Sequence, residues 1–192
     1  RVPPARSGGR GHGRYAGWIA LHAGAADSAD AILIPEIPYD IGNVVAKVRE
    51  RECNRRHFSI IVVAEGAAPQ DGGRAVLVLE EKSAGKAERL GGIGRKVSAE
   101  LEKLTGKETR VVVLGHLLRG GMPASQDRLI SLRFGAAAER APAEGRSGIM
   151  VALDPPVVNY VPLAASIRRM ETVPLACDTV LTARDLGISY GD

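Results

Sequence analysis

The sequence predicts an α/β fold in which helices cover both faces of a parallel sheet. Its strand-like runs are apolar throughout instead of alternating with polar residues, which is typical of strands buried on both faces. Amphipathic segments of helical length separate these runs, as they do in chains that build parallel sheets. Aromatic residues make up only 4% of the 192 residues, so the core rests on Val, Ile, Leu and Ala. This composition disfavours an aromatic-rich β-sandwich, and the length fits one domain.

The expected helices and strands follow one another along the chain. Strands are expected at residues 31–37, 59–66, 110–115, 149–153 and 157–163. Helices are expected at residues 15–29, 41–51, 89–105 and 126–140, and the segment 75–83 is either a strand or the start of a helix. Asp40 is placed to cap the helix that begins at residue 41, whose valines share one face. The tail from residue 164 to 192 is expected to hold short helix and turn.

Charge and composition exclude several classes of protein. The formal net charge is +4, and the four arginines within residues 1–14 account for all of it. The other 22 basic residues balance the 22 acidic ones, which does not favour a nucleic-acid-binding surface. Cys53 and Cys177 form neither a disulfide framework nor a metal-ligand spacing, and no apolar run approaches the roughly 20 residues of a membrane span. We therefore expect a cytoplasmic protein without a membrane span, a resident metal or a nucleic-acid partner.

The segment GHLLRGGMPASQDR (115–128) follows the third predicted strand. Ligands of parallel sheets bind beyond the carboxyl ends of the strands, which makes Glu65, His116 and Arg119 candidates. A guanidinium matches the geometry of a phosphate, the glycines at 120–121 let the backbone approach a ligand, and an imidazole can bond to a sugar hydroxyl. On spacing alone, a plain turn with a solvated Arg and a capping His is an open and simpler alternative.

The longer stretch ETRVVVLGHLLRGGMPASQDRLISLRFG (108–135) resembles the signature of the phosphofructokinase family. The family's usual form is Gly-His-x-Gln-Arg-Gly-Gly-Ser/Thr-Pro followed by Asp-Arg, from which Leu118 and Met122 depart. The resemblance covers nearly everything from Gly13 to Asp192, through the further segments GRYAGWIALHAG, ILIPEIPYD, SIIVVAEGA, MVALDPP, VPL and TVPL. It implies a three-layer, Rossmann-like phosphofructokinase fold with a parallel sheet, of which this chain is the substrate-binding half.

The resemblance also implies roles for individual residues. Glu65 is expected to accept hydrogen bonds from the hydroxyls of fructose 6-phosphate. His116 and Arg119 are expected to hold its 6-phosphate and the nearby sugar. Gly13 and Arg14 match a turn that closes over the substrate, where Arg14 steadies the transferring phosphate.

Further positions concern assembly and regulation. Arg110 is expected to reach the 6-phosphate in a neighbouring subunit's site, which implies a homodimer or homotetramer. Asp30 and Arg56 fall where bacterial relatives place an effector-nucleotide pocket. Asn54 and Ser28 stand where those relatives often have Lys and Gly, so solvated surface is the preferred interpretation of the Asp30–Arg56 pair.

The family's Gly-rich donor loop and catalytic Asp have no counterpart in this sequence. Phosphoryl transfer needs both, so Mg²⁺ and ATP or pyrophosphate are expected to bind in an absent amino-terminal half. The leading hypothesis is therefore part of an enzyme of glycolysis that phosphorylates the 1-hydroxyl of fructose 6-phosphate. The alternative is a non-catalytic sugar-phosphate-binding or regulatory remnant. The chain alone is expected to bind this sugar weakly or not at all, to turn none of it over, and to be poorly soluble because apolar surface is left uncovered.

Residues 1–13 are expected to be disordered or foreign to the fold, which then begins at Arg14. They are rich in Gly, Pro and Arg and show no periodicity. Suitable codons for residues 7–13, read one nucleotide later, can encode Arg-Val-Val-Glu-Val-Met-Gly, which continues the family's pattern. We therefore interpret residues 1–13 as an out-of-frame reading.

Overall fold

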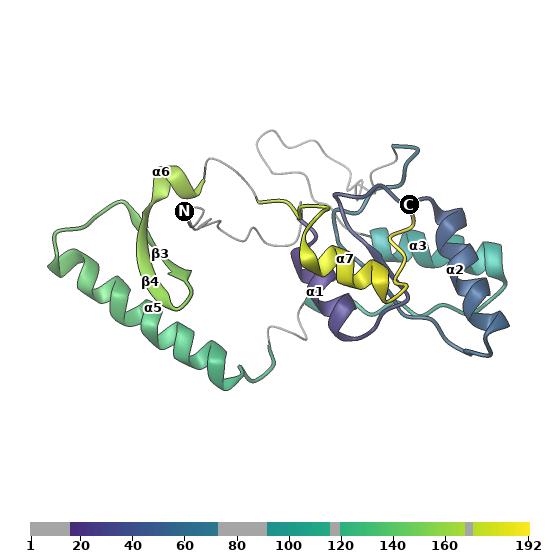
Figure 1. Cartoon of the computed structure of the whole chain (residues 1–192), viewed down its shortest axis with the longest axis horizontal. Coiled ribbons are helices and arrows are strands. Elements are labelled where there is room, and N and C mark those ends of the chain that lie inside the picture. Colours follow the sequence, from purple (N-terminus) through teal and green to yellow (C-terminus); the bar gives the residue numbers. More distant parts are fainter. Residues whose placement is uncertain (1–15, 73–91, 116–119, 168–170) are drawn as a thin grey trace, which may run out of the picture. The chain divides into compact units, whose positions relative to one another are not determined.

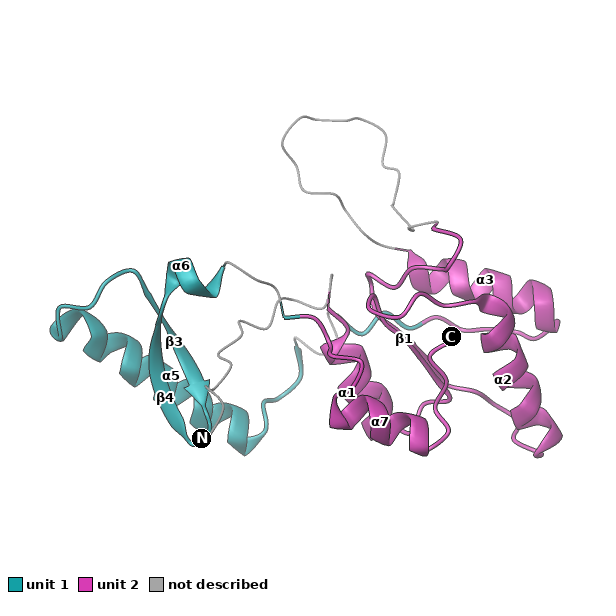
Figure 2. Cartoon of the chain, turned by 45° about the horizontal axis from the view of Figure 1, so that its top comes forward, with its two compact units in different colours: residues 1–10, 112–171 teal, residues 11–111, 172–192 magenta. Residues whose placement is uncertain are grey.

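The computed structural model describes residues 16–72, 92–115, 120–167 and 171–192 (Figure 1). They fall into two units, although the length alone predicts one domain (Figure 2). Of the described residues, unit 1 takes in 112–115, 120–167 and 171, and unit 2 takes in 16–72, 92–111 and 172–192. The chain thus leaves unit 2 after residue 111 and returns to it at residue 172.

Unit 2 is built on a short parallel sheet. Strand β1 (Ala31–Leu33) pairs in parallel with β2 (Ile61–Val63). On the other side of β1, the Ile32 N–H donates to the Ser189 carbonyl at 2.8 Å, and the Ser189 N–H donates to the Asp30 carbonyl at 3.0 Å. Every residue of β1 is buried, as expected for a strand with a neighbour on each side. The predicted parallel sheet is confirmed in this unit.

Helices cover both faces of the sheet, which gives unit 2 three layers (Figure 2). Alternate side chains of β1 belong to two different apolar clusters, because successive residues of a strand point to opposite faces. One cluster takes side chains from α1 (Trp18–Ala26) and α7 (Asp178–Asp185). The other takes them from α2 (Ile41–Cys53) and α3 (Ile93–Thr105). The predicted α/β architecture with helices on both faces is therefore confirmed.

Helix α1 packs against the sheet through glycines. A Cβ atom on Gly24 would lie 2.6 Å from Cγ1 of Ile32, and one on Gly17 would lie 2.5 Å from Cβ of Ile34. Neither position has room for a side chain, because a Cβ atom essentially never lies within 3.0 Å of a heavy atom from a residue distant in the chain. The small residues of this segment, predicted to form a closely packed helix, thus set the distance between α1 and β1.

Helices α2 and α3 match their predictions closely. The Oδ1 atom of Asp40 accepts a hydrogen bond from the Gly42 N–H at 2.7 Å, so α2 begins at the predicted cap. Three of the four apolar residues predicted on one face of α3 are buried, and Leu104 is 45% exposed at its end. The 3.6-residue period of the sequence therefore locates both helices.

Five of the described helices are followed by a left-handed residue, which in α3 is Gly106 at φ 71°, and the other four end in the same doubly hydrogen-bonded turn. In α7 and α5 (Ser125–Ala143) this residue is Gly187, at φ 77°, and Gly145, at φ 72°. In α1 it is Ser28 at φ 52°, and in α2 it is Arg55 at φ 59°. The left-handed region raises the free energy of residues that have a Cβ atom. The turns at Ser28 and Arg55 are therefore strained, whereas the turns at Gly145 and Gly187 are not.

Unit 1 consists of one long helix packed on a β-hairpin (Figure 1). Helix α5 contacts β3 (Ile149–Asp154) and β4 (Val157–Pro162), and α6 (Leu163–Ser166) follows. The Tyr160 hydroxyl on β4 donates to the Ala137 carbonyl of α5 at 2.9 Å. This bond and the packing of small α5 side chains hold the helix to the hairpin.

The apolar surface of α5 is largely uncovered. Ala137 and Ala141 are its buried residues, whereas Leu129 is 57% exposed and Leu132 is 72% exposed. A two-stranded hairpin with one helix buries too little apolar surface to be stable alone in water. Exposed leucines of this size on one helix mark a surface that another part of a protein covers.

Strands β3 and β4 of unit 1 form a separate two-stranded sheet. The two strands pair antiparallel, with Asp154 opposite Val157. Only Pro155 and Pro156 connect them, and a parallel pair needs a crossover of a dozen or more residues. The expected strands at 149–153 and 157–163 are three residues apart, which is also too short for a parallel crossover.

The strand predicted at residues 110–115 is wrong for this structure. None of these residues lies in a strand, and Val112, Val113 and Leu114 are 67%, 77% and 51% exposed. An apolar run reports a tendency to be buried, but a strand also needs a neighbouring backbone to bond. The segment predicted at 75–83 lies outside the described residues. Within the described part of the chain, no helix is long and apolar enough to cross a bilayer.

Candidate functional site

Three features of unit 2 lie at the carboxyl edge of its sheet. Parallel strands end at the same edge, so the residues that follow β1 and β2 lie there together, Glu36 after β1 and Glu65 after β2. Helix α1 runs towards the amino end of β1, so its first residues also lie at the carboxyl edge. The Gly17 N–H confirms this, because it donates to the Glu36 carboxylate at 3.0 Å. This edge is where ligands of parallel sheets bind.

Glu65 is an exposed carboxylate on a fixed backbone. The preceding residue, Ala64, donates its N–H to the Leu33 carbonyl at 2.8 Å and so extends the sheet by one bond. The Ala67 N–H then donates to the Ala64 carbonyl at 3.0 Å, which closes a turn around Glu65. The carboxylate is therefore held by its backbone and is open to solvent. It can accept hydrogen bonds from a ligand.

Glu36 was not among the predicted site residues. Its carboxylate accepts the Gly17 N–H and, at 2.8 Å, the Val173 N–H, which comes from the returning chain. The available signal was a charged residue between two prolines, in the segment ILIPEIPYD directly after a buried strand. Its partners are distant in sequence, so the contact itself could not be predicted.

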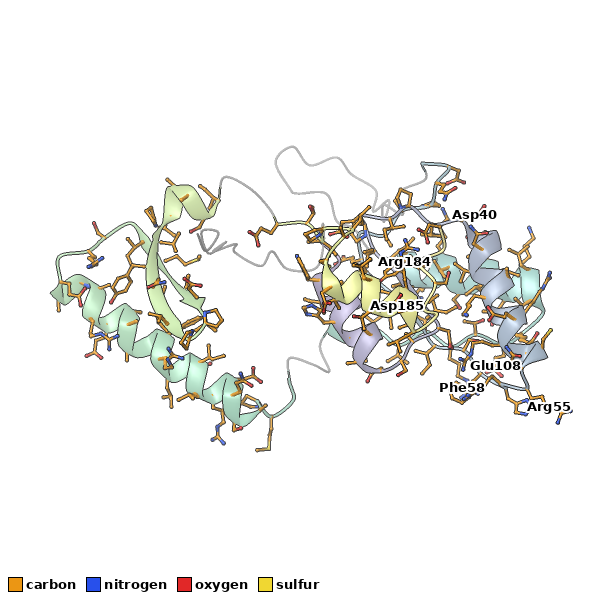
Figure 3. All side chains as sticks on the ribbon, in the orientation of Figure 1. Asp40, Arg55, Phe58, Glu108, Arg184 and Asp185 are labelled. Atoms are coloured by element: carbon orange, nitrogen blue, oxygen red, sulfur yellow. The ribbon has the colours of Figure 1, made fainter. Side chains whose placement is uncertain are left out.

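Arg110 lies in the segment that follows α3. It is largely exposed, and its Nε donates to Oε1 of Glu108 at 2.9 Å. Lys107 pairs with Glu52 near the carboxyl end of α2, and this end of α2 leads to the amino end of β2. Figure 3 shows Glu108 on the same side of unit 2 as the residues that follow α2, away from the cap of that helix. Glu108, two residues before Arg110, therefore lies towards the amino edge of the sheet, whereas Glu65 lies at the carboxyl edge.

The remaining predicted ligands lie outside the described residues: Gly13, Arg14, His116 and Arg119. The described part of the signature has a structural function. The Asp127 carboxylate accepts the Ala124 N–H at 3.1 Å and so satisfies a donor at the start of α5. Met122 is 92% exposed. The Asp of the signature is thus explained by helix capping and needs no ligand.

Asp30 is a buried structural residue. It is 5% exposed, and its Oδ1 pairs with Arg51 while its Oδ2 accepts the Ile60 N–H at 2.8 Å. The preferred interpretation of Asp30 as solvated surface is therefore wrong, because a buried carboxylate requires partners such as these. Arg56 is exposed, which agrees with its interpretation as solvated surface. The effector role of the two residues stays a prediction.

Few groups of the described residues have a clearly shifted pKa. Burial, followed by the nearby carboxylates of Glu100 and Asp71, raises the pKa of Tyr39 to about 12. Its hydroxyl is buried without a hydrogen-bond partner. Tyr39 is thus neutral at physiological pH and offers the site neither an acid nor a base. Nor do three or more His, Cys, Asp or Glu side chains of the described residues converge as they would to hold a metal ion.

Comparison with known proteins gives the family. Residues 11–141, which include both Glu65 and the signature, match the family model for phosphofructokinase. The chain belongs to the phosphofructokinase family. It is 54% identical over 180 residues to the ATP-dependent 6-phosphofructokinase of Chloroflexus aurantiacus, an alignment that covers 94% of this chain and 48% of that protein. It is 48% identical over 162 residues to the pyrophosphate–fructose 6-phosphate 1-phosphotransferase of Amycolatopsis methanolica, covering 84% and 47%.

Solved structures of phosphofructokinases share the fold. The pyrophosphate-dependent phosphofructokinase of Nitrosospira multiformis gives a TM-score of 0.67 at 21% identity, over 92% of this chain and 46% of that one. Phosphofructokinase from Saccharomyces cerevisiae gives a TM-score of 0.62 at 24% identity, over 93% and 22%. The chain spans about half the length of the curated relatives it matches. It therefore has the fold of one half of a phosphofructokinase.

Proposed function

We propose that this chain supplies the fructose 6-phosphate-binding part of a 6-phosphofructokinase, a phosphotransferase of glycolysis. The whole enzyme transfers a phosphoryl group to the 1-hydroxyl of that sugar. The observation that carries the proposal is Glu65, an exposed carboxylate on a fixed turn at the carboxyl edge of the parallel sheet. Relatives at 54% and 48% identity are named for this chemistry.

Each proposed ligand contacts a different part of the sugar phosphate. Glu65 accepts hydrogen bonds from the sugar hydroxyls, a role for which an ionised carboxylate is suited because it only accepts. Arg119 offers two parallel donors to the 6-phosphate, and His116 bonds to the phosphate and the nearby sugar. Gly13 and Arg14 close over the substrate, and Arg14 steadies the transferring phosphate. Together these groups hold the acceptor in place.

Arg110 serves the site of a second subunit in this proposal. Its segment begins near the amino edge, where Lys107 pairs with Glu52, whereas Glu65 lies at the carboxyl edge, and this difference supports the role. A site completed by a neighbouring subunit requires a homodimer or homotetramer. We place this assembly in the cytoplasm, where the sugar phosphate is used.

The phosphoryl donor binds elsewhere. The described residues of this chain offer no set of side chains fit to hold Mg²⁺, so no step through the metal is assigned to them. We place the donor, the metal and the base near the attacking hydroxyl in the part that the relatives have beyond this chain. ATP and pyrophosphate are both open as donors, because relatives with each in their names have similar identity to this chain.

The second candidate is a sugar-phosphate-binding module without catalysis, for which Glu65 at the carboxyl edge is an equally suitable ligand. The two proposals differ in affinity. A self-contained module binds fructose 6-phosphate tightly by itself, whereas half of a shared site binds it at millimolar concentration, equivalent to about 4 kcal/mol.

Calorimetry with fructose 6-phosphate, beside a coupled assay with ATP or pyrophosphate, separates the candidates. We expect weak binding and no turnover by the 192-residue chain. Micromolar binding without turnover would favour the module. Measurable turnover would show that the catalytic groups have been placed in the wrong half.

A further inference from the structure

The chain segments that carry β1 and β2 pair a second time beyond the sheet. The Tyr39 N–H donates to the Ala68 carbonyl at 3.0 Å, and the Gln70 N–H donates to the Tyr39 carbonyl at 2.9 Å. These bonds form a parallel bridge between Tyr39 and Pro69. Glu65 lies between this bridge and the end of β2, so the turn that carries it is bonded to the neighbouring segment both before and after it.

The side chain of Tyr39 is buried in the apolar cluster that also contains residues of α2 and α3. Ala67, two residues after Glu65, belongs to the same cluster and is 3% exposed. The Glu65 turn, residues 64–67, thus presents its carboxylate to solvent and packs its last residue into the core. Tyr39 fixes the end of this turn through its backbone bonds and through the cluster that its ring shares with Ala67.

A third segment is bonded to residues 39–40. The N–H of Asp40, which is labelled in Figure 3, donates to the Gly191 carbonyl at 2.7 Å. Gly191 has a left-handed backbone at φ 75°, and a Cβ atom on it would lie 2.8 Å from Cβ of Tyr39. This distance is shorter than Cβ atoms show in proteins, so a larger residue at position 191 displaces Tyr39 or its own segment. Residues 39–40 are therefore bonded both to residues 68–70 and to Gly191.

We infer that Tyr39 is a positioning residue, which holds the Glu65 turn in place through its backbone bonds to residues 68–70 and through its buried ring. This inference rests on the proposed function, in which Glu65 accepts hydrogen bonds from the sugar hydroxyls. The ring of Tyr39 is buried and touches no substrate. Loss of the bridge lets the turn adopt more positions, and binding must then order it again, so the affinity for the sugar phosphate falls.

The test first replaces Tyr39 in two ways in the 192-residue chain. Tyr39→Ala removes the ring, whereas Tyr39→Phe removes only a hydroxyl that has no hydrogen-bond partner among the described residues. NMR measures amide hydrogen exchange and the affinity for fructose 6-phosphate, which is compared at equal folded fraction. In Tyr39→Ala we expect the Gln70 amide to exchange about tenfold faster and the affinity to fall about fivefold. In Tyr39→Phe we expect both to match the wild type.

A pair of glycine variants tests the same contact without removing the ring. Gly191→Ala places a Cβ atom against Tyr39, whereas Gly187→Ala places one at φ 77° with the nearest heavy atom 4.0 Å away. Both variants have the strain of a left-handed alanine, but only Gly191→Ala disturbs Tyr39. We expect faster exchange at Gln70 and weaker binding of fructose 6-phosphate in Gly191→Ala, and neither change in Gly187→Ala.

Four outcomes overturn the inference. Unchanged exchange at Gln70 in both Tyr39→Ala and Gly191→Ala would show that Tyr39 does not hold this segment. Faster exchange with unchanged affinity would make Tyr39 a structural residue and leave the proposed function intact. An equal loss of affinity in Gly187→Ala would assign the effect to general destabilisation. No response of the wild-type chain to fructose 6-phosphate would count against the proposed function itself, and the inference would fail with it.

Discussion

Ser28 occupies a left-handed position that favours glycine, and replacing it should stabilise the chain. The Ser28 N–H donates to the Ala25 carbonyl at 3.3 Å and the Ala29 N–H to the Gly24 carbonyl at 2.8 Å, which closes the turn after α1. A residue with a Cβ atom pays about 1–2 kcal/mol in this conformation. Glycine loses about 0.5–1 kcal/mol more in conformational entropy on folding. The net gain expected for Ser28→Gly is about 0.5–1 kcal/mol.

The reverse substitution, glycine to serine, can be made in the turn after α7. Gly187 has the same role there at φ 77°, and the nearest heavy atom to a Cβ at this position is Nζ of Lys47 at 4.0 Å. Gly187→Ser therefore meets no steric clash, and its cost isolates the backbone conformation. We expect a loss of about 1 kcal/mol.

Urea denaturation followed by circular dichroism measures both variants, with thermal unfolding as a second readout. A gain of 1 kcal/mol corresponds to a rise in Tm of about 2–4 °C for a protein of this size. Opposite changes in Ser28→Gly and Gly187→Ser support the reasoning. If Ser28→Gly is destabilised or Gly187→Ser is unaffected, the left-handed conformation is not what determines the stability of these turns.

Three other predictions concern burial and pH. Asp30→Ala should cost about 3 kcal/mol in urea denaturation because it leaves the Arg51 partner unpaired, and additional replacement of Arg51 by Met should recover part of that loss. Replacing Leu129 and Leu132 together by Glu should raise the solubility limit without lowering Tm, whereas a loss of Tm would show that these exposed side chains are packed. The folded-state pKa of Tyr39 lies above its ordinary value of 10.0, at about 12, so the native state holds this proton longer than the unfolded state. Stability should therefore fall as pH rises from 10 to 12, and Tyr39→Phe should remove part of that fall in denaturation curves.

Local patterns in the sequence predicted most of unit 2. The apolar run at 31–37 and the helix after Asp40 are recognisable because burial on both faces and side-chain capping leave local signatures. The hairpin of unit 1 is also predictable, since the three residues between the expected strands are too few for a parallel crossover. The apolar pattern of the two runs indicates strands, and the length of the connection determines their relative direction.

Contacts between distant segments could not be predicted from the sequence. The run at 110–115 has the composition of a buried strand, but nothing in it shows whether a neighbouring backbone is present to pair with it. The partners of Asp30 and Glu36 come from other elements of the fold. From the sequence both carboxylates look solvated, but Asp30 is buried in an ion pair and Glu36 accepts hydrogen bonds from two distant backbone N–H groups. The family resemblance supplied the proposed substrate ligands, and of these the structure describes Glu65 and Arg110.

Binding of fructose 6-phosphate by the chain is the most direct test of the central claim. The 192-residue chain is titrated with the sugar phosphate while the backbone amides of Glu65 and Gly66 are followed by NMR, with Glu65→Gln and the exposed α5 variant Glu139→Gln alongside. We predict saturable shifts at these two amides at millimolar concentration in the wild type and in Glu139→Gln, and a loss of about tenfold in affinity in Glu65→Gln. Equal binding by Glu65→Gln and the wild type, or shifts confined to other surfaces, would contradict the account.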